Sequence, residues 1–105
     1  MGGAEHDTAV LWVELHISGE LHVSEGDNVT LSCNYSTTNF GDAIQWYRQF
    51  PKSRPEFLLY IYVQGTKSDP LPPRMSAEMD KDNKRVDLLI SSAAVSDYAL
   101  YYCAL

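Results

Sequence analysis

Two cysteines, Cys33 and Cys103, constrain the fold of this chain more than any other feature. Each lies in a stretch where apolar and polar residues alternate, so that Leu31 shares a face with Cys33 and Tyr101 shares a face with Cys103. Such alternation indicates a β-strand with one buried face. A disulfide closing a loop of about 70 residues would stabilise the fold by about 4 kcal/mol on the chain-entropy model. Two unpaired thiols in a cytosolic protein are the alternative, but the strand pattern favours a disulfide and an extracellular setting.

Other short stretches of the same character lie between turn signals that recur about every 8 to 12 residues. Residues 44–49 place Trp46 on one face and Tyr47 on the other, and residues 86–90 alternate in the same way. Residues 57–63 are apolar on both faces, which is typical of a fully buried strand or of a strand whose outer face meets a partner. The pattern predicts an all-β fold, with two antiparallel sheets packed face to face about 10 Å apart.

Composition limits the classes of function. The 105 residues allow one domain, and a formal net charge of −6 disfavours nucleic acid as a partner. The histidines, His6, His16 and His22, are scattered, so we expect neither a metal site nor a cofactor. We also expect no enzymatic activity, because the sequence has no Gly-x-Ser-x-Gly, phosphate-loop or paired-carboxylate motif. The acidic run 78–82 is predicted to be a solvated turn.

Two sequons, Asn28-Val29-Thr30 and Asn34-Tyr35-Ser36, support passage through the secretory pathway. Asn28 and Asn34 share parity with Thr30 and are therefore expected to face away from the core. We predict that at least one of the two asparagines is glycosylated.

The order of three motifs resembles an immunoglobulin variable domain. Cys33 is followed by Trp-Tyr-Arg-Gln at 46–49 and by Asp-Tyr-Ala-Leu-Tyr-Tyr-Cys at 97–103, and the chain closes with Cys-Ala-Leu. Within that family the chain is most similar to T cell receptor alpha-chain or delta-chain variable segments, from about residue 11 to residue 105. The resemblance implies a V-type antiparallel β-sandwich with one disulfide between the sheets.

The same resemblance implies that the last strand is missing. In the family this strand comes from a joining segment with a Phe-Gly-x-Gly motif, and no such motif follows Cys103. We therefore expect residues 1–10 to be an N-terminal extension and 11–105 to be a variable-type domain without its final strand. The strand ending in Cys103 would then be a sheet edge with unpaired backbone groups.

Several core roles follow from the resemblance. Trp46 would pack across the disulfide, and Tyr101 would form the tyrosine corner, in which its hydroxyl bonds to the chain upstream. Arg74 and Asp97 would close the lower end of the domain with a salt bridge. Tyr98 departs from the family, which commonly has a small residue at this position.

Two loops and one sheet face carry the functional expectations. The resemblance implies that two loops contact antigen, with the third loop beginning at Ala104-Leu105; the predicted contacts are Thr37, Thr38, Asn39, Phe40, Gly41, Asp42, Tyr62, Val63, Gln64, Gly65 and Thr66. A chain-pairing face is predicted from parity, because these side chains point away from Trp46 and the cysteines: Gln45, Tyr47, Gln49 and Tyr102. Phe57, Leu59 or Tyr60 could join them.

The predicted function is therefore that of an antigen-receptor variable domain. It would pair with a beta-chain (or gamma-chain) variable domain, through Gln49 among others, and contribute to recognition of peptide antigen presented by MHC. We expect it at the extracellular face of the plasma membrane, with the membrane anchor outside this chain. The alternatives are an innate immune-type or adhesion receptor domain, and an antibody light-chain variable domain, which more often carries Trp-Tyr-Gln-Gln.

Overall fold

The computed structural model describes residues 11–15 and 26–105, so the predicted N-terminal extension lies outside the described residues. Within the described ranges, every regular element is a strand except the short 3-10 helix Val95–Asp97. The strands in chain order are β1 (Leu11–Leu15), β2 (Val29–Asn34), β3 (Ala43–Gln49), β4 (Glu56–Tyr62), β5 (Met75–Asp80), β6 (Arg85–Ile90) and β7 (Ala99–Ala104).

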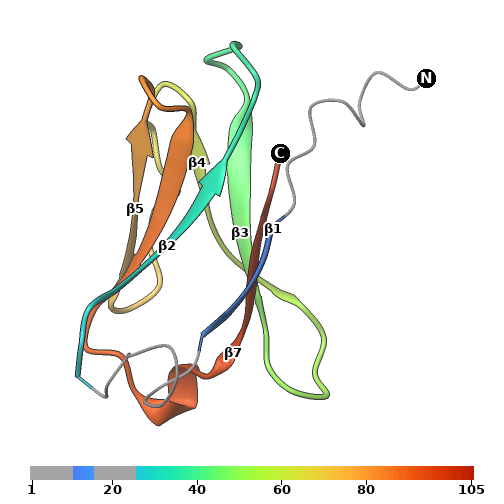
Figure 1. Ribbon diagram of the computed structural model, residues 1–105, viewed down its shortest axis with the longest axis vertical. Coiled ribbons are helices and arrows are strands. Elements are labelled where there is room, and N and C mark those ends of the chain that lie inside the picture. The colour runs from blue at the N-terminus through green and yellow to red at the C-terminus, as the bar shows by residue number, and fades with distance from the viewer. Residues whose placement is uncertain (1–10, 16–25) are drawn as a thin grey trace.

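The strands form two antiparallel sheets, one in the order β1-β7-β3-β4 and the other in the order β2-β6-β5 (Figure 1). The first loop, between β2 and β3, and the β5–β6 turn lie at the upper end in Figure 1, and the β3–β4 connection and the 3-10 helix lie at the lower end. This arrangement confirms the predicted V-type sandwich. No strand follows β7 in the part of the chain that the structure describes.

The core lies between the sheets, around the disulfide that joins Cys33 of β2 to Cys103 of β7. Trp46 and Tyr101 are both 0% exposed, and Trp46 lies directly opposite Cys103 in the β3–β7 ladder. Burial alternates along β2, β6 and β7, as the sequence pattern predicts. Each large apolar side chain buried in this way contributes about 1.5–3 kcal/mol to stability.

A β-bulge changes the facing of residues along β4. Trp46 pairs with Leu59 but Tyr47 pairs with Phe57, so Leu58 is the extra residue on β4. Leu58 and Leu59 are both buried, whereas Phe57 is 50% exposed. The bulge therefore explains how one continuous apolar run supplies both the core and the outer face, and it shows that Leu59 does not join the pairing face.

The prediction that β7 would be a free sheet edge is wrong. β1 lies beside β7 in antiparallel register, from Leu11 opposite Cys103 to Leu15 opposite Ala99. A strand with an uncovered edge has a row of N–H and C=O groups that need partners, so an extended segment of the same chain pairs with it readily. Sequence parity could not reveal this pairing, because residues 11–15 are remote from β7 in the chain.

Candidate functional site

The first loop, residues 35–42, is stabilised by its own polar side chains. Thr37 Oγ1 donates to Asp42 Oδ2 at 2.7 Å and accepts from the backbone N–H of Asn39 at 3.1 Å. Asn39 Oδ1 in turn accepts from the N–H of Gly41 at 2.8 Å. Short polar side chains that bond to the nearby backbone are what fix such turns. Hydrogen bonds within the chain thus hold the shape of the first loop.

The second loop, residues 62–66, is joined to the first by two backbone hydrogen bonds. The N–H of Val63 donates to the carbonyl of Asp42 at 2.9 Å, and the N–H of Gln64 donates to the carbonyl of Phe40 at 3.3 Å. Gly65 makes the tight turn possible, because its φ of +115° is accessible mainly to glycine. The two loops therefore form one connected surface at the upper end of the sandwich.

Exposure divides the predicted antigen contacts into two groups. Phe40 is 57% exposed, and its ring lies 5.7 Å from Lys81 Nζ of the β5–β6 turn. Thr37 and Val63, by contrast, are buried, at 9% and 1% exposure. These two side chains support the loops from beneath and do not reach the surface.

The outward side of β3, β4 and β7 carries a continuous set of aromatic rings, which we call the aromatic face. It comprises the outward side chains Gln45, Tyr47, Gln49, Phe57, Tyr60, Tyr62 and Tyr102. Tyr47 and Tyr102 stack with ring centroids 5.2 Å apart, and Phe57 meets Tyr47 edge-on at 5.8 Å. Tyr60 and Tyr62 extend the face toward the second loop, with centroids 5.6 Å apart. Partly exposed aromatic rings of this kind are typical of protein interfaces.

The amide groups of the aromatic face have partners within the chain. Tyr47 Oη donates to Gln45 Oε1 at 3.0 Å, and Gln49 Nε2 donates to the carbonyl of Ser53 at 3.0 Å. Below Gln49, a cavity of about 300 Å³ lies between the β3–β4 connection and the start of β7, and Phe50, Tyr98 and Leu100 are among its lining residues. Sequence parity missed Tyr62 and this cavity, because both depend on where the bulge and the β3–β4 connection lie.

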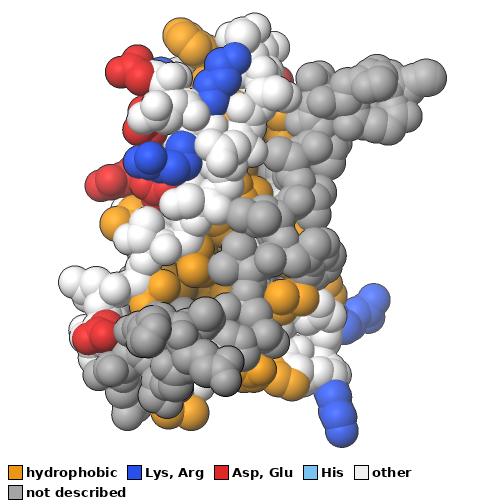
Figure 2. All heavy atoms as spheres, in the orientation of Figure 1, with side chains coloured by type: hydrophobic (Ala, Val, Ile, Leu, Met, Phe, Trp, Pro, Cys, Tyr) orange, Lys and Arg blue, Asp and Glu red, His pale blue; other side chains and the backbone are white. Residues whose placement is uncertain are grey.

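The outward side of the other sheet, which we call the charged face, has the opposite chemistry. Arg85 pairs with Asp87 at 3.1 Å and with Asp80 at 3.3 Å, and Asp87 also accepts from the hydroxyl of Ser32 at 2.7 Å. Figure 2 shows side chains of both charges gathered over the upper part of this sheet. Because the opposite charges already pair with each other, this face has little net attraction for a partner.

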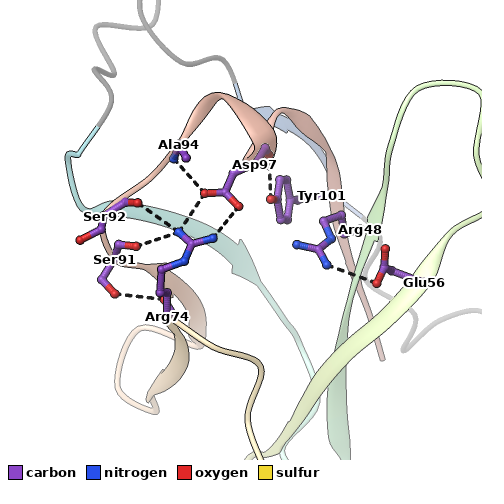
Figure 3. A network of polar contacts seen from close by, with 8 residues as sticks. All are labelled: Arg48, Glu56, Arg74, Ser91, Ser92, Ala94, Asp97 and Tyr101. Atoms are coloured by element: carbon purple, nitrogen blue, oxygen red, sulfur yellow. Dashed lines mark hydrogen bonds and ion pairs between the residues drawn. The ribbon is translucent and has the colours of Figure 1, made fainter.

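The lower end of the sandwich is closed by the predicted Arg74–Asp97 pair (Figure 3). The guanidinium makes two bonds of 3.0 Å to the carboxylate and also donates to the carbonyls of Ser91 and Ser92. The hydrogen bond from Arg74 holds the pKa of Asp97 below its ordinary value. Tyr101 Oη donates to the carbonyl of Asp97 at 2.9 Å, which is the predicted tyrosine corner, and burial raises the pKa of this hydroxyl.

One polar contact of this region has no signal in the sequence. Arg48 pairs with Glu56 at 3.2 Å and lies 4.7 Å from the ring centroid of Phe50. Its strand parity places Arg48 on the inward side with Trp46. Because Arg48 lies near the end of β3, its guanidinium extends to Glu56 at the lower end of the sandwich (Figure 3). Arg48 therefore links β3 to β4 at the lower end.

Both sequon asparagines are exposed, as their parity predicts. Each side chain makes one hydrogen bond to the backbone of the neighbouring segment. Asn28 Oδ1 accepts from the N–H of Ser92 at 3.2 Å, and Asn34 Nδ2 donates to the carbonyl of Lys84 at 3.4 Å. Asn28 thus lies near the lower end of the sandwich, and Asn34 lies next to the first loop. Among the described residues there is also no helix long and apolar enough to span a bilayer.

Comparison with known proteins places this geometry in a family. The model of the immunoglobulin V-set domain matches residues 17–105, and the chain belongs to that family. It is 38% identical to human T cell receptor alpha variable 39, over 90% of this chain and 92% of that protein. It is also 38% identical to human T cell receptor alpha variable 36/delta variable 7, over 80% of this chain and 71% of that protein. The chain is thus an antigen-receptor variable domain of the T cell receptor alpha type.

One longer relative contains a segment similar to this chain as part of a larger receptor chain. Human T cell receptor alpha chain MC.7.G5 is 34% identical over 81% of this chain, but the matched part covers only 30% of that receptor chain. These relatives favour a T cell receptor segment over the innate-receptor and light-chain alternatives.

Proposed function

We propose that this domain pairs with a beta-chain or gamma-chain variable domain through its aromatic face, and that its two loops contact peptide presented by MHC at the extracellular surface of a cell. The role is binding, without catalysis or a cofactor. The observation that carries the pairing proposal is the Tyr47–Tyr102 stack at 5.2 Å, with the half-exposed Phe57 beside it.

The energetic argument rests on the contrast between the two sheet faces. An aromatic cluster on a rigid sheet loses little side-chain entropy when a partner covers it, and it contributes a large apolar area. The interface centre would be Tyr47 and Tyr102, with Gln45 and Gln49 supplying hydrogen bonds. Gln49 would exchange its bond to Ser53 for one to the partner.

Co-expression with a T cell receptor beta-chain variable domain, followed by sizing chromatography, tests the pairing. We expect a heterodimer that Tyr102→Asp abolishes and Gln49→Glu weakens, because each places a charge in a surface that must lose its water. Leu89→Asp is the matched control, since Leu89 points outward on the opposite sheet. Equal heterodimer yields from Tyr102→Asp and Leu89→Asp would refute the pairing face, provided that both variants unfold cooperatively.

For antigen contact, the support is the exposed Phe40 on a loop held by Thr37 and Asp42. The paired receptor, selected against a library of peptide–MHC complexes, supplies a ligand for the test. Phe40→Ala is expected to weaken that ligand by about tenfold or more, as for an aromatic anchor. An exposed residue of the opposite end, Val95→Ala, should leave binding unchanged.

Two smaller proposals accompany this role. The folded domain spans residues 11–105, and residues 1–10 precede it as an extension. Asn28 and Asn34 are N-glycosylation sites, supported by their exposure. A mass that does not change after glycosidase treatment of protein made in mammalian cells would contradict the second proposal.

A further inference from the structure

The cavity at the lower end of the sandwich lies between two segments that are remote in the chain. Its volume is about 300 Å³, near the lower limit for sites that hold small molecules. Phe50 and Pro51 of the β3–β4 connection line one side, and Tyr98 and Leu100, at the start of β7, line the other. The cavity therefore offers rings and an aliphatic chain to a ligand with one aromatic ring and a short side chain.

Bonds within the chain hold the walls of this cavity. Arg48, paired with Glu56 at 3.2 Å, lies 4.7 Å from the ring centroid of Phe50. The N–H of Ser53 donates to the carbonyl of Phe50 at 3.0 Å, and Gln49 Nε2 donates to the carbonyl of Ser53 at 3.0 Å. A site that is already shaped loses little entropy when a ligand enters, because few groups must be ordered.

The β3–β4 connection also carries positive charge that no acidic group of the described chain neutralises. Lys52 lines the cavity, and Arg54 follows two residues later. Both are exposed, and within residues 11–15 and 26–105 neither side chain has an ion pair or a hydrogen bond. Figure 2 shows basic side chains projecting at the lower right, where Figure 1 draws this connection. On a chain of net charge −6, this region is the one suited to an anion.

The backbone of Lys52 adds an argument of a different kind. Its φ is +60°, a region that glycine adopts without steric cost and that is unfavourable for other residues. The turn would therefore form more readily with glycine, and the fold by itself does not explain a lysine here. Backbone strain is often retained at functional sites, where the side chain that causes it has a role. An anionic ligand in the cavity would give Lys52 such a role.

We propose that the cavity between the β3–β4 connection and the start of β7 binds a small aromatic carboxylate. The ring of the ligand packs against Phe50, Tyr98 and Leu100, and its carboxylate pairs with Lys52. The proposal goes beyond the proposed function, because the cavity lies at the opposite end from the two loops and its test uses the unpaired chain.

Titration of the isotope-labelled chain of residues 1–105 with phenylacetate, followed by NMR of the backbone amides, tests the site. We expect saturable shifts in residues 49–53 and 98–100, with a dissociation constant of about 1 mM. Phenylacetamide has the same size without the charge, and it should bind about threefold more weakly or worse, as for an ion pair near the surface. Acetate has the charge without the ring, and it should give no saturable shifts.

Two glycine substitutions form a matched pair of variants. Lys52→Gly removes the charge and relaxes the turn, so the variant should fold as well as the unmodified chain, bind phenylacetate about threefold more weakly and bind phenylacetamide equally. Lys84 also has a positive φ, of 50°, but lies in the β5–β6 turn at the other end. Lys84→Gly makes the same change of charge and backbone, and it should leave the binding of both ligands unchanged.

The apolar part of the site is tested by Tyr98→Ala. This variant should bind phenylacetate and phenylacetamide about fivefold more weakly, because both lose contact with the same ring. Cooperative unfolding in denaturant shows that each variant is folded.

Several results would overturn the proposal. Equal binding of phenylacetate and phenylacetamide would show that the charge has no role. Equal losses for Lys52→Gly and Lys84→Gly would show an effect of net charge alone. Unchanged binding to Tyr98→Ala, or shifts that lie outside residues 49–53 and 98–100, would place the ligand elsewhere. An absence of saturation at about ten times the expected dissociation constant would show that the cavity is not a binding site.

Discussion

The two sheets share one core, but their outer faces differ in how far contacts within the chain satisfy their polar groups and cover their apolar area. On the charged face, Arg85 binds Asp80 and Asp87, so its polar groups are largely satisfied by one another. On the aromatic face, Tyr47, Phe57 and Tyr102 contact one another yet keep apolar area at the surface. The difference is that the charged face is compensated by its own ion pairs, whereas the aromatic face keeps exposed apolar area, and this contrast is the basis for proposing the aromatic face as the pairing side.

The largest loss of stability should come from a substitution in the core that lies beneath both faces. Trp46→Ala is expected to cost about 3–5 kcal/mol, because Trp46 is fully buried against the disulfide and the cavity would be large. Such a loss is a large fraction of the stability of about 5–15 kcal/mol that is typical of a folded domain. Denaturant unfolding measures it, with the exposed Val95→Ala as a control that should change stability by less than about 0.5 kcal/mol. A loss below about 1 kcal/mol for Trp46→Ala would contradict the described core.

The next effect separates the faces. Tyr47→Ala should weaken pairing with a beta-chain variable domain by about 2 kcal/mol or more, which is roughly thirtyfold. Tyr47→Phe should weaken the same pairing by only about 0.5–1.5 kcal/mol, since it keeps the ring and removes only the hydroxyl bonded to Gln45. Titration of the partner domain measures both, and Asp87→Ala on the charged face should leave the affinity unchanged. If Asp87→Ala weakened pairing as much as Tyr47→Ala, the two faces would not differ in function.

A smaller effect concerns the lower end, where Arg74 and Asp97 connect the sheet bearing the charged face to β7. Asp97→Asn should destabilise the domain by about 1–3 kcal/mol at pH 7 through the loss of charged hydrogen bonds. The pKa of Asp97 is lowered from 3.8, so this stabilisation is complete at neutral pH and is lost as the pH falls below about 4.

The pH profile of Asp97→Asn is therefore diagnostic. Its stability difference from the unmodified domain should shrink between about pH 5 and pH 2, as measured by thermal unfolding across that range. A difference that stays constant down to pH 2 would mean that the carboxylate does not contribute through its charge.

The smallest effect is expected on the charged face itself. Arg85→Ala should reduce stability by about 0.2–1 kcal/mol, because its ion pairs lie near the surface and are screened by water. Added salt should reduce the difference further. Unfolding at low and high ionic strength measures it, and a loss above about 2 kcal/mol would show that the charged face supports the core directly.

Strand parity around Cys33, Trp46 and Cys103 predicted most of the sandwich, because alternation reports directly on burial. The family resemblance, and not strand parity, predicted the Arg74–Asp97 pair and the tyrosine corner. Strand parity could not predict that β1 lies beside β7, because the segment that pairs with a sheet edge is chosen by contacts between distant parts of the chain. Nor could it orient Phe57 and Tyr62 unambiguously, because one bulged residue, Leu58, shifts the register of β4.

Which residues of the two predicted antigen-contact loops are exposed also did not follow from loop composition alone. Thr37 and Val63 belong to the loops by sequence but are buried, because the loops turn over them. Conversely, Lys81 comes from the distant β5–β6 turn and lies beside Phe40. Contacts between loops that are remote in the chain cannot be derived from the residues of one loop.

The two backbone bonds that join Phe40 and Asp42 to residues 63 and 64 have a practical consequence for engineering. Because main-chain atoms make these bonds, they survive changes of side chain but not changes of loop length. The exposed positions of the two loops can therefore be varied independently as long as Thr37, Asp42 and Gly65 are kept, whereas an insertion in either loop would displace the other. A graft onto another framework should carry residues 35–42 and 62–66 together as a single module.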